Sequence, residues 1–155
     1  MEKELLVKVA FACMACDGEI DATEIDCIQQ VFANNDLINK ESLSVLLNEL
    51  RDKLNLDSKA FFNTLFAELS DAVMSESEEL ELIEVAIKII EADNVIDYNE
   101  VKLLKKIRSY LKINDKVLLN AMPDKEDYIA SDINRVVDFL DDFSSNINIK
   151  EIQLH

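Results

Sequence analysis

The chain has 155 residues, a formal net charge of −16, and only one glycine and one proline. So few turn residues argue against a β-sandwich or an α/β fold, whereas a helical bundle can close its connections with Asn, Asp and Ser. The negative charge repels phosphate backbones and anionic lipid, so nucleic acid is excluded as a partner and direct membrane insertion is not expected.

Apolar residues recur at helical spacing along most of the chain, which predicts an all-α bundle of about seven to eight helices. Asp57, Ser75 and Asp97 are expected N-caps, Asn114 starts a short helix, and Pro123 stops it. Residues 147–155 alternate weakly between polar and apolar and are interpreted as a docked extended tail. In chain order the helices are expected at about 2–16, 22–34, 40–54, 58–73, 75–92, 98–112, 114–123 and 132–143.

An internal repeat is the most informative feature of the sequence. Sliding the chain against itself aligns Asp17 with Asp93, Asp21 with Asp97, and Glu24 with Glu100; apolar positions match as well. The repeats, about 4–34 and 80–112, are expected to be helix–turn–helix units that pack in pseudo-twofold fashion. Residues 1–123 would then form one helical domain, with a C-terminal helix and tail, 124–155, packed on it.

The repeated turn has a structural explanation in part. Asp21 and Glu24 have the spacing of a capping box, flanked by Ile20 and Ile25 as a hydrophobic staple, and the second copy repeats all four parts. Asp17 and Asp93 are not explained this way, because a negative charge at a helix C-terminus opposes the helix dipole. A divalent cation would favour carboxylates there; its candidate ligands are Asp17, Asp21, Glu24, Asp93, Asp97 and Glu100.

A comparison with the EF-hand limits that hypothesis. The first turn fits the second half of the calcium loop, but Cys13 and Ala15 occupy the first two ligand positions and cannot supply hard oxygen ligands. Calcium takes about 6–8 oxygens, so a half-loop leaves the ion largely to water. Any bound divalent cation is therefore expected to be weakly held, and no other cofactor is expected.

Nucleophilic catalysis is not expected. The only histidine is His155, the last residue of the sequence, and no Ser or Cys nucleophile has a histidine base. Cys13 and Cys16 have CxxC spacing but fall near the end of the first helix, where the dipole does not activate a thiolate. They are interpreted as buried thiols in a reducing cytoplasm.

One basic stretch stands out in this acidic chain. It runs from 101 to 112 without an acidic residue and predicts either a solvated face paired with the acidic helix at 75–92, or a dock for an acidic partner segment. The candidate partner-binding residues are Lys102, Lys105, Lys106, Arg108 and Lys112.

Two segments carry a family resemblance: ACMACDGEIDATE, which ends at Glu24, and IIEADNVIDYNE, which ends at Glu100. Together they resemble the TerB tellurite-resistance family over roughly residues 4–122. The resemblance implies a compact helical bundle with its acidic turns near one another and with divalent metal proposed at their acids. It also implies a non-enzymatic role in stress response or phage defence. Asn94 stands where the second copy would carry glycine.

These observations predict a cytoplasmic, non-enzymatic, acidic interaction module that acts with a protein partner; a homodimer is one form such an assembly can take. The first alternative is a metal-responsive sensor or buffer whose helix packing changes when a cation binds. A carboxylate-based metallohydrolase is the weaker alternative, since nothing in the sequence marks one carboxylate as acid and another as base.

Overall fold

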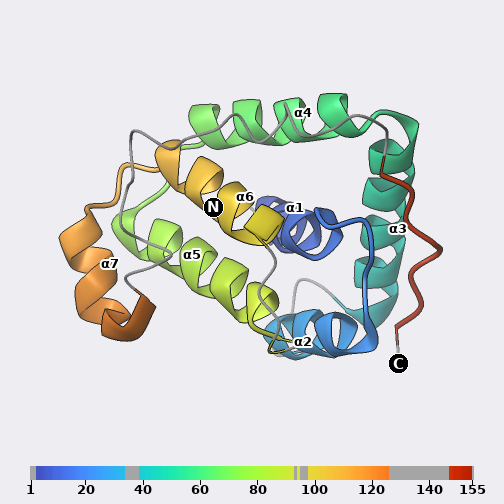
Figure 1. Ribbon diagram of the computed structural model, residues 1–155, viewed down its shortest axis with the longest axis horizontal. Coiled ribbons are helices and arrows are strands. Elements are labelled where there is room, and N and C mark those ends of the chain that lie inside the picture. The colour runs from blue at the N-terminus through green and yellow to red at the C-terminus, as the bar shows by residue number, and fades with distance from the viewer. Residues whose placement is uncertain (1–2, 34–38, 93, 95–97, 126–146, 155) are drawn as a thin grey trace.

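The computed structural model describes residues 3–33, 39–92, 94, 98–125 and 147–154 (Figure 1). Within these ranges all regular secondary structure is helical, which confirms the all-α class. The helices are α1 (Lys3–Ala15), α2 (Ala22–Phe32), α3 (Lys40–Leu56), α4 (Ser58–Asp71), α5 (Glu76–Ile90), α6 (Tyr98–Ser109), α7 (Asp115–Ala121) and a 3-10 turn (Pro123–Lys125). The helix expected at 132–143 lies outside the described residues.

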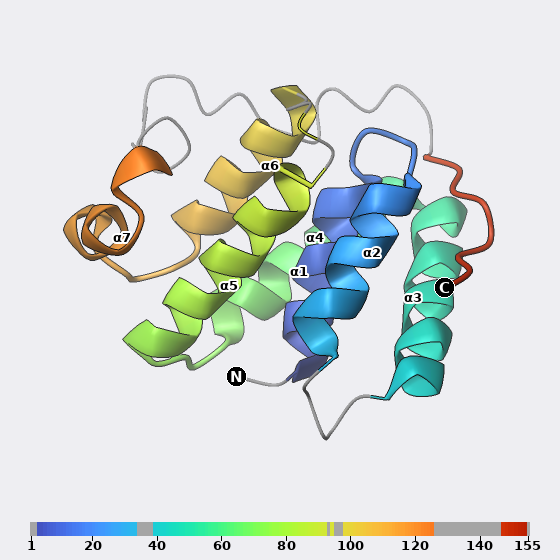
Figure 2. The ribbon, with the colours of Figure 1, turned by 90° about the horizontal axis from the view of Figure 1, so that it is seen from below.

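Helix α1 is the centre of the bundle. It packs against α3, α4, α5 and α6, and Figure 2 shows it enclosed between α5 and α3. Every residue from Val9 to Ala15 is fully buried. A helix that is apolar around its whole circumference is stable only when other elements cover it on all sides, and the sequence of α1 is of that kind.

Local capping fixes where the helices begin. Asp21 and Ser75 form complete capping boxes at α2 and α5, and the Asp57 carboxylate accepts a hydrogen bond from the Ala60 amide at the start of α4. The Asn114 side chain caps α7 through the Lys116 amide. Each of these caps satisfies a backbone donor that the first helical turn leaves without a partner.

Helix α6 ends at Ser109, three residues earlier than the sequence suggested. Its last turn tightens, with Tyr110 N donating to Ile107 O. The buried carboxylate of Glu79 then accepts hydrogen bonds from Lys112 N at 3.1 Å and from Ile113 N at 2.7 Å. These amides are therefore held by α5, which directs the chain out of the helix and towards α7.

Residues 147–154 form an extended segment along the outer side of α3, visible in Figures 1 and 2. Ile147, Ile149 and Ile152 are buried there, and the residues between them are exposed. The segment pairs with side chains of α3 and with Ser58, so it adds an ordered layer to the bundle without forming regular secondary structure.

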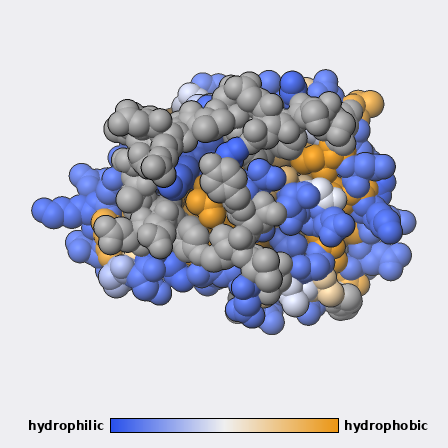
Figure 3. Space-filling view, viewed as in Figure 1, coloured by the Kyte–Doolittle hydropathy of each residue, from blue (hydrophilic) through white to orange (hydrophobic). Residues whose placement is uncertain are grey.

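The surface in Figure 3 is largely hydrophilic where it is described, with apolar patches on the side of α3. Among the described residues, three large apolar side chains are exposed: Val45, Leu56 and Val73. Over the described ranges, the helices are too short or too polar to cross a bilayer.

Candidate functional site

The first acidic turn is held together by its own hydrogen bonds. Asp17 Oδ1 accepts from Glu19 N at 3.0 Å, and Gly18 N donates to Ala15 O at 3.0 Å. Gly18 has φ +91°, a conformation that residues with a Cβ rarely adopt. Asp17 therefore has a structural role that the sequence did not reveal, because its carboxylate caps the turn in the manner of an Asx-turn.

The capping box of α2 has the predicted geometry. Asp21 Oδ1 accepts from Glu24 N at 2.9 Å, and Glu24 Oε1 accepts from Asp21 N at 3.2 Å. Of the three candidate metal ligands of the first turn, Asp17 and Asp21 remain exposed at the surface, whereas Glu24 is buried.

Among the described acids of the two turns, Glu24 and Glu100 are buried, with 4% and 3% of their surface exposed. Burial is the main cause that raises the pKa of Glu24 to about 9; the nearby charges of Asp21, Asp17 and Glu100 add to the rise, and the hydrogen bond from Asp21 opposes it. The same two glutamates act on Cys13 of α1: its pKa is raised mainly by burial, then by Glu100 and Glu24. The structure thus brings one glutamate of each turn to the same end of α1.

The second turn shares a backbone feature with the first. Asn94 has φ 61°, and its amide donates to Glu91 O at 3.1 Å, as Gly18 does to Ala15. Asparagine tolerates this left-handed conformation better than most residues with a Cβ, so the absence of a second glycine does not prevent the same turn. Asp93 and Asp97 lie outside the described residues.

The metal hypothesis can be tested against the described ligands. Among them, no three His, Cys, Asp or Glu side chains are grouped so that they could hold an ion. Asp17 and Asp21 already accept backbone hydrogen bonds, and Glu24 turns back onto the Asp21 amide. The described part of the first turn therefore does not fit a metal ion by itself, and Cys13, being buried with a raised pKa, is a poor thiolate ligand.

The basic residues of α6 are partly engaged within the fold. The Lys106 ammonium lies 5.8 Å from the ring centroid of Phe66 and 5.6 Å from that of Tyr110. Arg108 forms an ion pair with Asp115. Lys112 is exposed, but its backbone amide is held by Glu79. Lys102 and Lys105 are half-buried on the same helix.

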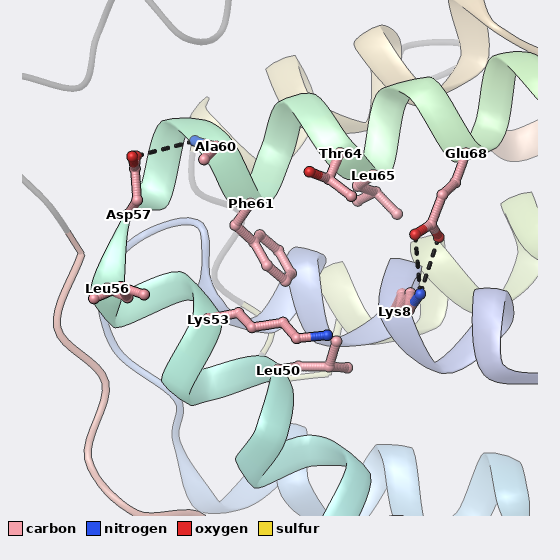
Figure 4. Close-up of a pocket in the computed structure, with 10 residues that line it drawn as sticks. All are labelled: Lys8, Leu50, Lys53, Leu56, Asp57, Ala60, Phe61, Thr64, Leu65 and Glu68. Carbon is pink, nitrogen blue, oxygen red and sulfur yellow. Dashed lines mark hydrogen bonds and ion pairs between the residues drawn. The ribbon is translucent and has the colours of Figure 1, made fainter.

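A groove that sequence reasoning missed lies between α1, α3 and α4 (Figure 4). Its hollow has a volume of about 250 Å³ and is lined mainly by apolar atoms. Its polar lining includes Lys53, Asp57 and Thr64. It also includes the ion pair of Lys8 with Glu68, in which Lys8 Nζ lies 3.0 Å from both carboxylate oxygens. A second hollow shares Lys8, Thr64 and Glu68 with the first and continues along α1 and α4 to Val73 and Met74.

Two exposed apolar residues lie along this groove. Leu56 lines the first hollow with 82% of its surface exposed, and Val73 lines the second with 94% exposed. The one sequence signal that points to the groove is Lys8, which interrupts an otherwise apolar helix. The rest depends on how α4 crosses α3 and α1, which a local pattern does not encode.

Comparison with known proteins gives one family. The family model described as Tellurite resistance protein TerB matches residues 4–122. No curated protein and no solved structure matches the chain.

Proposed function

The chain belongs to the TerB family, and from that premise we propose that it is a non-enzymatic interaction module that binds a protein partner through the groove between α1, α3 and α4. The cytoplasmic setting and the stress-response role that its sequence suggested are parts of this proposal. The metallohydrolase alternative gains no support from the groove, because nothing among its described residues marks one carboxylate as acid and another as base.

The observation that carries the proposal is the open apolar hollow with exposed Leu56 at its edge. Small-molecule sites occupy roughly 300–1,000 Å³, and this hollow is smaller. It suits one or two apolar side chains of a partner, and such anchors carry most of the energy of a protein interface. The Lys8–Glu68 ion pair beside it supplies polar atoms that can fix the orientation of a bound segment.

Site-specific photo-crosslinking in the organism's own cells tests the proposal. We expect a photoreactive residue at Leu56 or Val73 to trap a discrete protein adduct, and one at Val45 to trap none. Val45 is the matched control, because it is apolar and 60% exposed but does not line the groove. Adducts of equal yield at all three positions, or none at Leu56 and Val73, would reject the groove as the docking site.

The basic face of α6 is a less favoured docking surface. Lys106 and Arg108 already contact Phe66, Tyr110 and Asp115, so a partner would have to compete with interactions inside the fold. If an acidic partner segment nevertheless binds there, charge reversal at Lys105 will weaken its capture without lowering the melting temperature, whereas reversal at Lys106 also removes its contacts with Phe66 and Tyr110.

A metal-responsive sensor is a second candidate, favoured by the buried Glu24 and Glu100. Burial and the neighbouring charges of Asp21, Asp17 and Glu100 raise the pKa of Glu24, and a cation beside its carboxylate would lower it again. Titration of calcium, magnesium, manganese and zinc, read by melting temperature, tests this candidate. A shift that is lost in the Asp17→Asn, Asp93→Asn double variant supports a sensor, and the absence of a shift with every ion removes it.

A further inference from the structure

The C-terminal segment 147–154 is bound to α3 through its backbone. Asn55 Oδ1 accepts from Ile149 N at 2.7 Å, and Asn55 Nδ2 donates to Ile149 O at 2.8 Å. Asn48 pairs with Ile152 in the same way: its Oδ1 accepts from Ile152 N at 2.9 Å, and its Nδ2 donates to Ile152 O at 3.0 Å. Each asparagine amide thus satisfies both the donor and the acceptor of one tail residue, as an adjacent β-strand would.

The third polar contact continues the series. Ser58 Oγ accepts from Ile147 N at 2.7 Å and donates to Leu54 O at 2.9 Å. Ser58 is itself buried, and its hydroxyl joins the start of the segment to the junction of α3 and α4.

The spacing of the two asparagines matches an extended chain. Asn48 and Asn55 are two turns apart on one face of α3, so their Cα atoms are separated by roughly 10.5 Å along the axis. The three residue steps from Ile149 to Ile152 span roughly 10 Å when extended. The helix therefore presents two side-chain amides at the spacing of an extended segment, although its own backbone groups are internally bonded.

The apolar side chains of the segment pack against the bundle, three isoleucines fully and Leu154 in part. Ile147, Ile149 and Ile152 are buried, whereas Asn148, Lys150, Glu151 and Gln153 are exposed. The hydrogen bonds from Asn48, Asn55 and Ser58 involve only main-chain atoms of the segment. Its buried positions require only that the side chains be apolar. Strand-addition complexes divide affinity and specificity in this way: main-chain hydrogen bonds supply affinity, and pockets for particular side chains supply specificity.

We propose that this face of α3 is a binding site for an extended segment of a partner protein, with branched apolar residues at its first, third and sixth positions, and that the chain's own tail occupies the site until the partner displaces it. The seated tail defines the chemistry of the occupant. It carries one Lys and one Glu, and in a chain of net charge −16 a neutral or basic segment is favoured over an acidic one. This site is separate from the groove between α1, α3 and α4, so the two proposed binding sites do not depend on each other.

A partner segment from another molecule must compete with the chain's own tail, which is covalently attached. A tethered segment competes at an effective concentration that reaches the millimolar range for short flexible connections. We therefore use the whole chain with a specific protease site inserted between residues 125 and 147. Cleavage removes the tether and keeps every part of the protein present.

The readout is fluorescence anisotropy of a labelled synthetic peptide of residues 147–154. We expect the cut protein to bind it and the uncut protein to bind it at least about tenfold more weakly, because the tethered tail competes. A peptide N-methylated at Ile149 and Ile152 loses both backbone donors but keeps its side chains, and it should bind at least about tenfold more weakly than the unmodified peptide. Equal binding of the two peptides would overturn backbone recognition by Asn48 and Asn55.

An unrelated neutral peptide with valine at its first, third and sixth positions separates the possible occupants. Binding to the cut protein within about tenfold of the tail peptide supports a partner segment, since only the apolar pattern is shared. Absence of binding overturns the proposal and leaves the site specific for the tail. Dimerisation of the uncut protein that is lost on Ile149→Asp would assign the site to the tail of a second copy and would also overturn it.

Hydrogen exchange in the uncut protein covers the case in which cleavage unfolds the chain. If the tail is displaceable, the amides of Ile149 and Ile152 open without global unfolding and exchange at least about tenfold faster than the slowest amides of α1. Exchange at the same rate as α1 would make the tail part of the core and would overturn the proposal.

Discussion

Glu24 both caps α2 and lies buried beside other acids, and burial disfavours its charged form near neutral pH. Its carboxylate closes the capping box of α2, yet burial and the charges of Asp21, Asp17 and Glu100 raise its pKa to about 9 from an ordinary value of 4.5. A pKa that is higher in the folded state means that folding favours the protonated form. The contribution of Glu24 to stability is therefore fully present below pH 4.5 and is lost as pH rises towards 9.

Glu24→Gln should therefore stabilise the protein under alkaline conditions. Glutamine can still accept the Asp21 amide in a capping box, but it carries no charge. We expect the free energy of unfolding to rise by on the order of 1 kcal/mol at pH 8 and to change little at pH 5, measured by chemical denaturation with a chelator present.

Glu78→Gln is the matched control for this prediction. Glu78 holds the same position in the capping box of α5, where Ser75 N donates to its carboxylate at 3.0 Å, but it is more exposed than Glu24. Its substitution should leave stability within about 0.5 kcal/mol at both pH values. A loss of stability in Glu24→Gln at pH 8 would contradict the protonated form in the folded state.

Substitution of Gly18 tests whether the first acidic turn depends on a positive φ at this position. A Cβ built at Gly18 meets nothing within 4 Å, so a substitution costs only the backbone conformation at φ +91°. Gly18→Ala is expected to lower the free energy of unfolding by about 1 kcal/mol. Gly18→Asn should lower it by less, because Asn94 adopts φ 61° in the second turn. Equal losses in the two variants, measured by urea denaturation, would show that the turn does not depend on this conformation.

At the scale of elements, Glu79 joins α5 to the connection between α6 and α7. It is buried and accepts three hydrogen bonds from two backbone amides, those of Lys112 and Ile113. Glu79→Gln would turn an NH₂ group towards those donors and remove the charge that strengthens the bonds. We expect a loss of about 2–3 kcal/mol in the free energy of unfolding.

Glu76→Gln is the control in the same helix, because Glu76 is exposed in the first turn of α5. It should change stability by less than about 0.5 kcal/mol. If Glu79→Gln were as mild as this control, the early end of α6 would need a cause other than its capture by α5.

The caps and the tail show which elements a sequence can specify by itself. Asp21, Asp57 and Ser75 act on amides within three residues, so their patterns predicted the helix starts correctly. Glu79 acts on amides 33 and 34 residues away, and Asn55 on a backbone 94 residues away. Nothing near either residue in the sequence signals such a contact, so the end of α6 and the binding of the tail required the structure.

The acidic turns divide in the same way. The capping box of the first turn was predictable from spacing, whereas the hydrogen bond from Glu19 to Asp17 and the burial of Glu24 and Glu100 were not. The high pKa of Glu24 depends on what packs over it. The groove beside Leu56 likewise arises from the crossing of α4 over α3, and an exposed leucine in a sequence does not by itself indicate a docking surface.

At the scale of the whole molecule, α3 is shared by the two proposed interaction surfaces. Leu50 and Lys53 line the groove, whereas Asn48 and Asn55 hold the tail. Positions 48 and 50 are about 200° apart around the helix, so the two surfaces lie on different faces of α3. A partner at one surface can therefore leave the other open, and the cross-linking and peptide experiments can fail or succeed independently.

The net charge of −16 is the other property of the whole chain, and it predicts a general dependence on salt. Like charges repel most in the compact state, and the Debye length falls from roughly 30 Å at 0.01 M salt to roughly 8 Å at 0.15 M. Screening should therefore raise the melting temperature. A gain of about 1 kcal/mol corresponds to about 2–4 °C for a chain of this size.

This dependence sets the baseline for every cation measurement on the protein. Magnesium and sodium chloride compared at equal ionic strength should give the same melting temperature if the ions only screen the charge. A larger rise with magnesium that disappears in the Asp17→Asn, Asp93→Asn variant would reveal a site, because both proteins experience the same screening. A melting temperature that does not rise with sodium chloride would contradict the prediction and would mean that local pairs such as Lys8–Glu68 outweigh the net charge, since screening weakens such pairs.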